Sequence, residues 1–161
     1  MTERDFTAAA ERYLDMVYRI ALNYFRHPQD AEDAAQEAML RLWRTDTNFE
    51  GENHLRRFLV RVTLNVCRDF SRSPWRKRTV PLESCREPEF STPERSELYQ
   101  AVMALPEKYR LPLYLFYYEG YQAAEIGQIL GIPTATVHTR LSRGRAKLKE
   151  LLGGYGYEQS V

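Results

Sequence analysis

Residues 71–93 break an otherwise helical sequence into two parts. Four prolines punctuate this stretch, and no helical repeat of apolar residues crosses it. A structureless segment of that length does not belong inside a compact domain. We therefore predict a domain over residues 1–72, a flexible linker over 73–92, a second domain over 93–153 and a tail over 154–161.

Both domains are predicted to be helical, which makes the fold class all-α. Apolar residues recur every three to four positions, the period of an amphipathic helix. Thr92, Pro93 and Glu94 open the second domain with a capping hydroxyl, a proline in the first turn and an acid at the positive end of the helix dipole. The predicted helices span residues 3–26, 30–44, 53–71, 94–105, 107–118, 122–130 and 134–152.

The N-terminus and the cysteines argue against secretion, a membrane span and a metal site. No apolar signal-peptide stretch follows Met1, and the most apolar run, residues 111–118, is far too short to span a bilayer. Cys67 and Cys85 are not spaced as a metal knuckle or a redox pair. We expect a soluble, cytoplasmic protein without a metal or a cofactor.

Charge is segregated along the chain, although the formal net charge is only +1. Two basic patches on a nearly neutral body suggest DNA contacts that are individually weak, so that a partner must hold the chain on DNA. One patch comprises Arg56, Arg57, Arg61, Arg68, Arg72, Arg76, Lys77 and Arg78, and the other comprises Arg140, Arg143, Arg145, Lys147 and Lys149.

Residues 122–152 have the order of features that a helix-turn-helix motif needs. Gly127 is small where the two helices must nearly touch, and Gly131 permits the left-handed residue of the turn. The apolar residues of the second helix form one stripe that is expected to face the core. That stripe comprises Val137, Leu141, Gly144, Leu148 and Leu151.

The opposite side of that helix is predicted to read DNA in the major groove. Small hydroxyls and an arginine can approach base edges without bulk. A solvated amphipathic helix is the alternative, but the turn signal and the lack of acidic residues over 134–149 favour DNA reading. The residues opposite the stripe are Thr139, Ser142, Arg143 and Ala146, with His138 and Arg140 on the flanks.

The third helix carries a basic face that suits a phosphate backbone. Asn65 lies within this face, where it could bond a base edge or be an ordinary surface residue. The basic face comprises Arg57, Arg61, Asn65, Arg68 and Arg72, and the apolar stripe opposite it comprises Leu55, Leu59, Val62, Val66 and Phe70.

The second helix turns alanines and Leu42 inward and charged residues outward. Leu40 stands among the charged residues, which suggests an anchor for a protein partner, although single exposed leucines are also common. Trp43 is expected at the edge of the core. The inward residues are Ala31, Ala34, Ala35, Ala38 and Leu42, and the residues around Leu40 are Asp33, Gln36, Glu37 and Arg44.

Several stretches together resemble the extracytoplasmic-function sigma factors, the compact branch of the sigma-70 family. Residues 30–44 (DAEDAAQEAMLRLWR) look like the family's polymerase-binding helix, and residues 49–51, 58–62 and 65–69 look like its −10 segment. The −35-reading domain is matched by LPEKYR at 105–110, YYEG at 117–120, GIPTATV at 131–137 and RLSR at 140–143. Gly127 stands where the family usually has alanine, which predicts a helix less stable by about 1 kcal/mol.

The resemblance implies a non-enzymatic transcription initiation factor with a region 2-like helical bundle and a region 4-like helix-turn-helix domain. The second helix would dock on the β′ clamp helices of core RNA polymerase, and the second domain would sit on the β flap. The linker would thread through polymerase, and an anti-sigma factor would hold the protein inactive. The polymerase-binding residues would be Asp33, Gln36, Glu37, Leu40 and Arg44.

The resemblance also assigns two sets of promoter contacts. The loop from Phe49 to Leu55 would capture a flipped base of the −10 element, and the third helix would hold the opened strand. The −10 set is Phe49, Gly51, Glu52, Asn53, His54, Leu55, Arg57, Arg61, Asn65 and Arg68. The −35 set is Thr136, His138, Thr139, Arg140, Ser142, Arg143 and Lys147.

Two other functions are compatible with parts of the sequence. A stand-alone helix-turn-helix regulator would use the first domain as a sensor, but it leaves the basic face of the third helix and the long linker unexplained. A helical enzyme would use His27, Asp30, Asp33 and Glu37 as a metal site, yet no second helix offers the matching ligands that a di-metal bundle requires.

Overall fold

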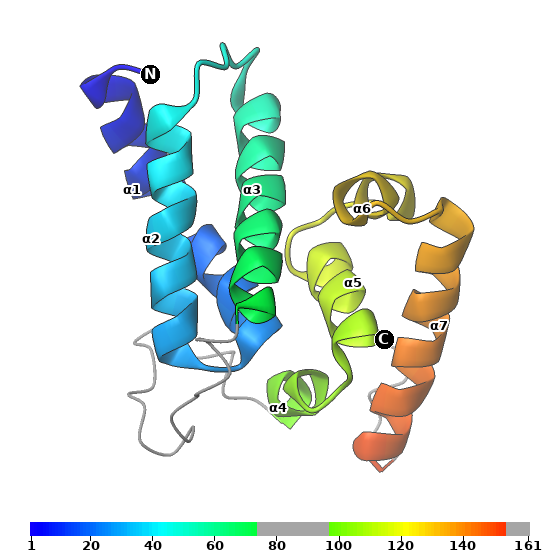
Figure 1. Ribbon diagram of the computed structural model, residues 1–161. Helices are drawn as coiled ribbons and strands as arrows, with labels where there is room; N and C mark the ends of the chain where they lie inside the picture. The colour runs from blue at the N-terminus through cyan, green and yellow to red at the C-terminus, as the bar shows by residue number, and fades with distance from the viewer. Residues whose placement is uncertain (74–96, 154–161) are drawn as a thin grey trace. The chain divides into compact units, whose positions relative to one another are not determined.

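The computed structural model describes residues 1–73 and 97–153, and within these ranges the chain is helical without any strand. The helices form two compact units, one with α1–α3 and one with α4–α7 (Figure 1). The all-α, two-domain fold class is therefore confirmed. The predicted linker beyond Ser73, the helix start at Thr92–Glu94 and the tail all lie outside the described residues.

The first unit contains α1 (Glu3–Phe25), α2 (Pro28–Arg44) and α3 (Glu52–Arg72). Helix α1 begins after Thr2, whose hydroxyl accepts a hydrogen bond from the Asp5 amide at 3.1 Å. Helix α2 begins two residues earlier than predicted. His27 caps it by accepting the Asp30 amide at 3.3 Å, and Pro28 occupies the first turn, where its missing N–H costs nothing. The His27-Pro28 break is thus also a helix start.

The alanine face of α2 forms the centre of the first core, as predicted. Ala31, Ala34, Ala38 and Leu42 are fully buried, and Ala35 is nearly so. Small side chains at these positions let the backbone of α2 come close to its neighbours, and α2 packs against both α1 and α3 (Figure 1). The apolar contribution of α1 comes mainly from Val17, Ile20 and Ala21, which are also fully buried.

The inward face of α3 differs from the predicted stripe. Leu55, Val62 and Phe70 are only half-buried. The predicted stripe assumed a single packing partner, whereas α3 contacts both α1 and α2. Its buried face is therefore wider than one stripe and includes polar Thr63. The Thr63 hydroxyl is satisfied by donating to the Leu59 carbonyl at 2.6 Å. The residues of α3 that are buried are Leu59, Val60, Thr63, Leu64, Val66 and Cys67.

The second unit contains α4 (Glu97–Met103), α5 (Glu107–Tyr117), α6 (Ala123–Leu130) and α7 (Thr134–Leu151). Helices α5 and α7 run beside each other, and α6 packs against both (Figure 1). The stripe of α7 is buried as predicted at Val137, Leu141 and Leu148, but Leu151 is 55% exposed. Leu152 is buried in its place, because it lies four residues after Leu148 and continues the same face.

Buried polar groups brace the second unit. The Arg110 side chain is 2% exposed and donates to the Leu105 carbonyl at 2.6 Å. The Tyr114 hydroxyl donates to the Glu119 carboxylate at 2.7 Å, also in the interior. These contacts fix the two ends of α5, the helix against which α7 is positioned. Among the described residues, no helix has the length and apolarity needed to cross a membrane.

Candidate nucleic-acid and partner interfaces

The turn between α6 and α7 has the geometry predicted for a helix-turn-helix motif. Gly131 is left-handed, with φ +71°, and the Gly127 carbonyl accepts both the Gly131 amide and, at 3.0 Å, the Ile132 amide. A Cβ atom on Gly127 would lie 2.8 Å from the Ile132 carbonyl oxygen, closer than real Cβ contacts. Both glycines are therefore required by the backbone: one by its φ angle and one by the close approach.

The side of α7 opposite its core stripe lies open to solvent. His138, Thr139, Ser142 and Arg143 are exposed, as are Ala146 and Lys147, while Thr136 and Arg140 are half-exposed. The Thr139 hydroxyl donates to the Ala135 carbonyl at 3.1 Å, so its oxygen still has lone pairs for a further donor. No acidic residue lies on α7 before Glu150. This face can approach a polyanion without charge repulsion.

Two basic residues of α7 have partners on α5 that sequence reasoning missed. The Arg145 Nε atom donates to the Tyr117 hydroxyl at 2.9 Å, and its guanidinium lies 5.8 Å from the Phe116 ring centroid. The Lys147 ammonium lies 5.8 Å from the Tyr109 ring centroid. Arg145 therefore ties α7 to α5. The aromatic run over 116–118 is the only sequence signal that could have indicated this role.

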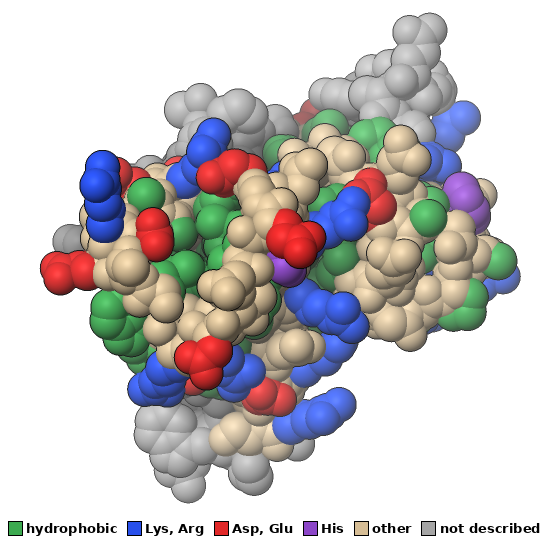
Figure 2. Space-filling view, turned by 90° about the horizontal axis from the view of Figure 1, so that it is seen from above, with side chains coloured by type: hydrophobic (Ala, Val, Ile, Leu, Met, Phe, Trp, Pro, Cys, Tyr) green, Lys and Arg blue, Asp and Glu red, His purple; other side chains and the backbone are tan. Residues whose placement is uncertain are grey.

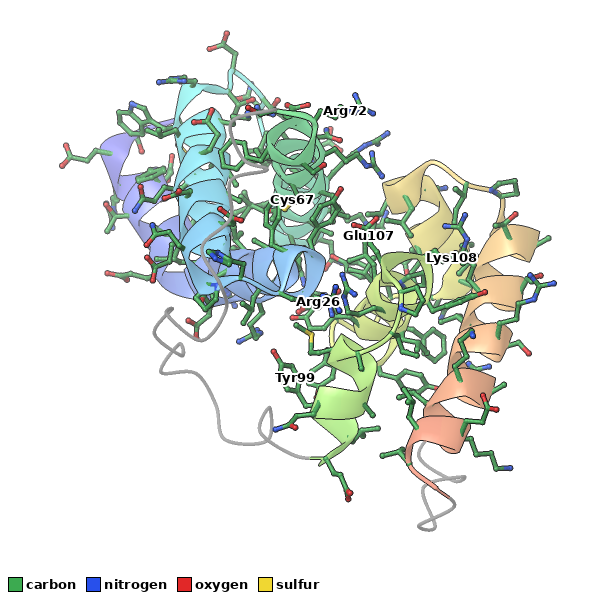
Figure 3. The ribbon with its side chains drawn as sticks, turned by 60° about the horizontal axis from the view of Figure 1, so that its bottom comes forward. Arg26, Cys67, Arg72, Tyr99, Glu107 and Lys108 are labelled. Carbon is green, nitrogen blue, oxygen red and sulfur yellow. The ribbon has the colours of Figure 1, made fainter. Side chains whose placement is uncertain are left out.

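The predicted basic face of α3 is present. Arg57, Arg61, Asn65 and Arg72 are exposed, and Arg68 is half-exposed. In Figure 3, Arg72 points outward from the end of α3, whereas Cys67 lies inside the three-helix unit. The one acid of this stretch, Asp69, is paired with Arg41 of α2 at 3.0 Å. Its charge is therefore compensated by a neighbour, and the basic character of the face is preserved.

The loop before α3 ends one residue earlier than predicted. The helix predicted over 53–71 begins at Glu52, so Glu52–Leu55, which the resemblance placed in the −10 loop, form its first turn. The Leu55 amide closes that turn by donating to the Gly51 carbonyl at 3.2 Å. Gly51, with φ +103°, is the residue that precedes the helix.

The loop folds back on the start of α3. The Phe49 ring packs edge-on against Phe58, with centroids 5.0 Å apart, and against His54, at 5.2 Å. The Glu50 amide donates to Nδ1 of His54 at 3.0 Å. Figure 2 looks down on this end of the unit and shows acidic and basic side chains lying next to each other around it. The loop is thus held in one shape by the helix that follows it.

A link from α1 also reaches this place. The Tyr13 hydroxyl donates to Oε2 of Glu52 at 2.5 Å, and Arg12 pairs with Oε1 of the same carboxylate at 3.3 Å. Tyr13 is 8% exposed, whereas the Glu52 side chain is largely exposed. Burial raises the pKa of Tyr13 above its usual value, and the hydrogen bond and negative charge of Glu52 raise it further. Tyr13 is therefore a hydrogen-bond donor at neutral pH.

The candidate docking face of α2 is partly open. Gln36 and Arg44 are exposed, and Leu40 is 43% exposed, while Asp33 and Glu37 are half-buried. Glu37 pairs with Arg41 at 3.5 Å, and Asp33 accepts from Gln29 at 3.2 Å. Leu40 is thus an apolar side chain on an otherwise polar surface, as predicted.

Trp43 is a second exposed apolar side chain on α2. Its ring is 44% exposed and packs edge-on against Phe6 of α1, with centroids 5.2 Å apart. The expectation that Trp43 lies at the edge of the core holds for one side of the ring only.

The acidic residues and His27 near the start of α2 do not form a metal site, because no group of three or more His, Cys, Asp or Glu in the described ranges is placed to hold an ion.

Comparisons with known proteins identify both units. Residues 9–77 match the family described as sigma-70 region 2, and residues 95–148 match sigma-70, region 4. The chain is 32% identical to the ECF RNA polymerase sigma factor SigE of Mycolicibacterium smegmatis, with 91% of this chain and 61% of SigE covered. It is 30% identical to the ECF RNA polymerase sigma factor SigM of Mycobacterium tuberculosis, with 92% of this chain and 77% of SigM covered. The chain thus spans less than two thirds of the length of SigE.

A solved structure has the same fold. The sigma factor RpoE from Bartonella quintana, crystallised in complex with the anti-sigma factor NepR, superimposes with a TM-score of 0.76 at 22% identity. The superposition covers 93% of this chain and 98% of that one.

Proposed function

The chain belongs to the extracytoplasmic-function branch of the sigma-70 family, and on this basis we propose that it binds core RNA polymerase and directs it to specific promoters. The observation that supports the proposal is the presence of two surfaces on separate units whose charge suits contact with DNA. One is the outer face of α7, without acidic residues, and the other is the basic face of α3 with its adjoining loop. The chain itself catalyses no reaction in this proposal; the chemistry belongs to polymerase.

We propose that residues 1–72 act as the polymerase-docking domain. A docking surface needs an apolar anchor surrounded by polar groups that set its orientation. Leu40 supplies the anchor on α2, and the partner would be the clamp helices of the β′ subunit. The polar groups are Asp33, Gln36, Glu37 and Arg44.

The same domain would recognise and open the −10 element. The loop residues Phe49 and Gly51 and the first turn of α3 would form a site for a base turned out of the helix. The exposed arginines of α3 would then hold the phosphates of the opened strand. This set comprises Phe49, Gly51, Glu52, Asn53, His54 and Leu55 around the loop, and Arg57, Arg61, Asn65 and Arg68 along α3.

We propose that residues 93–153 read the −35 element with α7 in the major groove. Arg143 is exposed near the middle of the outer face, where a guanidinium can bond both acceptors of a guanine. Lys147 would contact phosphate while its ammonium stays near the Tyr109 ring. The set comprises Thr136, His138, Thr139, Arg140, Ser142, Arg143 and Lys147, and the unit would also contact the β flap.

The linker over 73–92 would pass through polymerase between the two sites. An anti-sigma factor is the expected inhibitor, in line with the complex in which the structurally similar RpoE was crystallised. The protein would act in the cytoplasm, where polymerase works.

The test is reconstitution with purified core polymerase, followed by run-off transcription from a library of promoters. We expect core polymerase alone to be inactive on these templates and the added chain to select those that share one −35 and one −10 sequence. Failure to co-purify with core polymerase would contradict the proposal. It would favour the alternative of a stand-alone helix-turn-helix regulator.

A further inference from the structure

Glu52 is placed differently from the other residues of the proposed −10 surface. Both oxygens of its carboxylate are engaged on the side of α1: Oε2 accepts from the Tyr13 hydroxyl at 2.5 Å and Oε1 pairs with Arg12 at 3.3 Å. A carboxylate turned toward DNA would be repelled by the phosphates. Here it faces a hydroxyl and a guanidinium instead, so it is suited to holding two helices together.

The position of Glu52 in the chain makes this link matter for the loop. Glu52 is the first residue of α3, where an acid also interacts favourably with the helix dipole. Gly51 precedes it with φ +103° and has no side chain to cap the helix. Helix α3 therefore has no side-chain N-cap, and the tie to α1 holds its first residue in addition to the loop's own contacts with the helix.

The loop depends on the first two turns of α3 for its shape. Phe49 packs on His54 and Phe58, and the Glu50 amide donates to His54. If the first turn of α3 shifts or frays, these three contacts move with it. The Tyr13 hydrogen bond and the Arg12 pair both join this turn to α1, and Tyr13 is the buried one of the two partners, 39 residues from Glu52 in sequence.

We propose that Tyr13 is a positioning residue for −10 recognition, acting through Glu52 to hold the first turn of α3 and thereby the Phe49 loop in the shape that accepts a base. Tyr13 is buried, so its ring is not placed for a direct base contact. Glu52 anchors the start of the helix through its contacts with α1. This inference rests on the proposed role of the first domain in reading the −10 element.

The test uses Tyr13→Phe in the full chain, reconstituted with core polymerase. The substitution removes the hydroxyl and keeps the ring in the core, so the fold and polymerase binding should persist. Run-off transcription is measured on templates with each of the four bases at every −10 position. Because the Glu52 carboxylate is largely exposed, the lost bond should count as an ordinary hydrogen bond and reduce the preference for the best base by about threefold to tenfold. The ranking of −35 variants should not change.

Two further variants test whether Tyr13 acts through Glu52. Glu52→Ala removes both the Tyr13 hydrogen bond and the Arg12 pair, so it should lose at least as much base preference as Tyr13→Phe. The double variant Tyr13→Phe/Glu52→Ala should lose no more than Glu52→Ala alone. Tyr24→Phe is the matched control, because Tyr24 lies on the same helix and its hydroxyl contacts Ser71 at the other end of α3, at 3.3 Å.

Two results would overturn the inference. One is an unchanged −10 preference in Tyr13→Phe while the wild type discriminates among bases. The other is a double variant that loses clearly more base preference than Glu52→Ala alone, which would mean that Tyr13 does not act through Glu52. A wild type that shows no −10 preference at all would instead refute the proposed function, and the inference with it.

Discussion

Replacing Gly127 with alanine tests how the two helices of the helix-turn-helix motif are held together. Helix propensity alone predicts that alanine stabilises α6 by about 1 kcal/mol. The structure opposes this gain, because the new Cβ atom would lie 2.8 Å from the Ile132 carbonyl oxygen and 3.5 Å from the Thr134 amide nitrogen. Both are backbone atoms in the turn, so neither can rotate away.

The net effect follows from the two opposing contributions. Overpacking in a closely packed region costs about 1–3 kcal/mol, from which the propensity gain of about 1 kcal/mol is subtracted. We expect the second unit to be destabilised by about 1 kcal/mol, which corresponds to roughly 4–8 °C in Tm for a domain of this size. The turn should open, because it is the only part that can relieve the contact.

Amide hydrogen exchange measured along α6 and α7 in the full chain is the suitable assay. It reports on each amide of the unit directly, whereas both tryptophans, Trp43 and Trp75, lie outside residues 97–153. Ala124→Gly is the control: it lies exposed on the same helix and should cost about 1 kcal/mol through propensity alone. If Gly127→Ala instead increases protection by a similar amount, the close approach of the two helices is not as described.

Three other predictions follow from the proposed interfaces. The double variant Glu37→Lys/Leu40→Ala should lose co-purification with core polymerase while its thermal unfolding stays near wild type, because the buried alanine face is untouched. Arg143→Ala should flatten the ranking of −35 variants in run-off transcription, since a bidentate base contact contributes about 1–3 kcal/mol. Lys149→Ala should instead weaken all promoters equally. A uniform loss in Arg143→Ala would show that Arg143 does not read a base. Because the pKa of Tyr13 in the folded state is raised above its usual value of 10.0, the first unit should lose stability as pH rises above 10. Tyr13→Phe should reduce this alkaline loss in a denaturant titration.

The helices and the two-domain fold could be predicted because they depend on local patterns. Helical spacing of apolar residues and the alanine face of α2 each identify an element from its own sequence. The exact core faces could not be predicted for helices that contact more than one neighbour. Phe70 was assigned to the core of α3 and Leu151 to that of α7, because a stripe drawn on one isolated helix does not show how neighbouring helices rotate its buried face or where the last turn ends.

The contacts that the sequence missed join residues far apart in the chain. Tyr13 and Glu52 are 39 positions apart, and Arg145 and Tyr117 are 28 apart. Neither pair has a periodic signal, because each depends on how whole helices pack. Gly127 illustrates the same limit. Its low helix propensity suggested that alanine would make α6 more stable, whereas the backbone of the following turn leaves no room for a methyl group.

Promoter binding by the chain with and without core polymerase tests the central claim most directly. The chain carries a formal net charge of only +1, so we expect the attraction of its two proposed DNA-binding surfaces to DNA to be weak. We predict that the chain with core polymerase forms a stable, sequence-specific promoter complex and opens the DNA, while the chain alone forms none at the same concentration. Equally tight and specific binding by the chain alone would contradict the account.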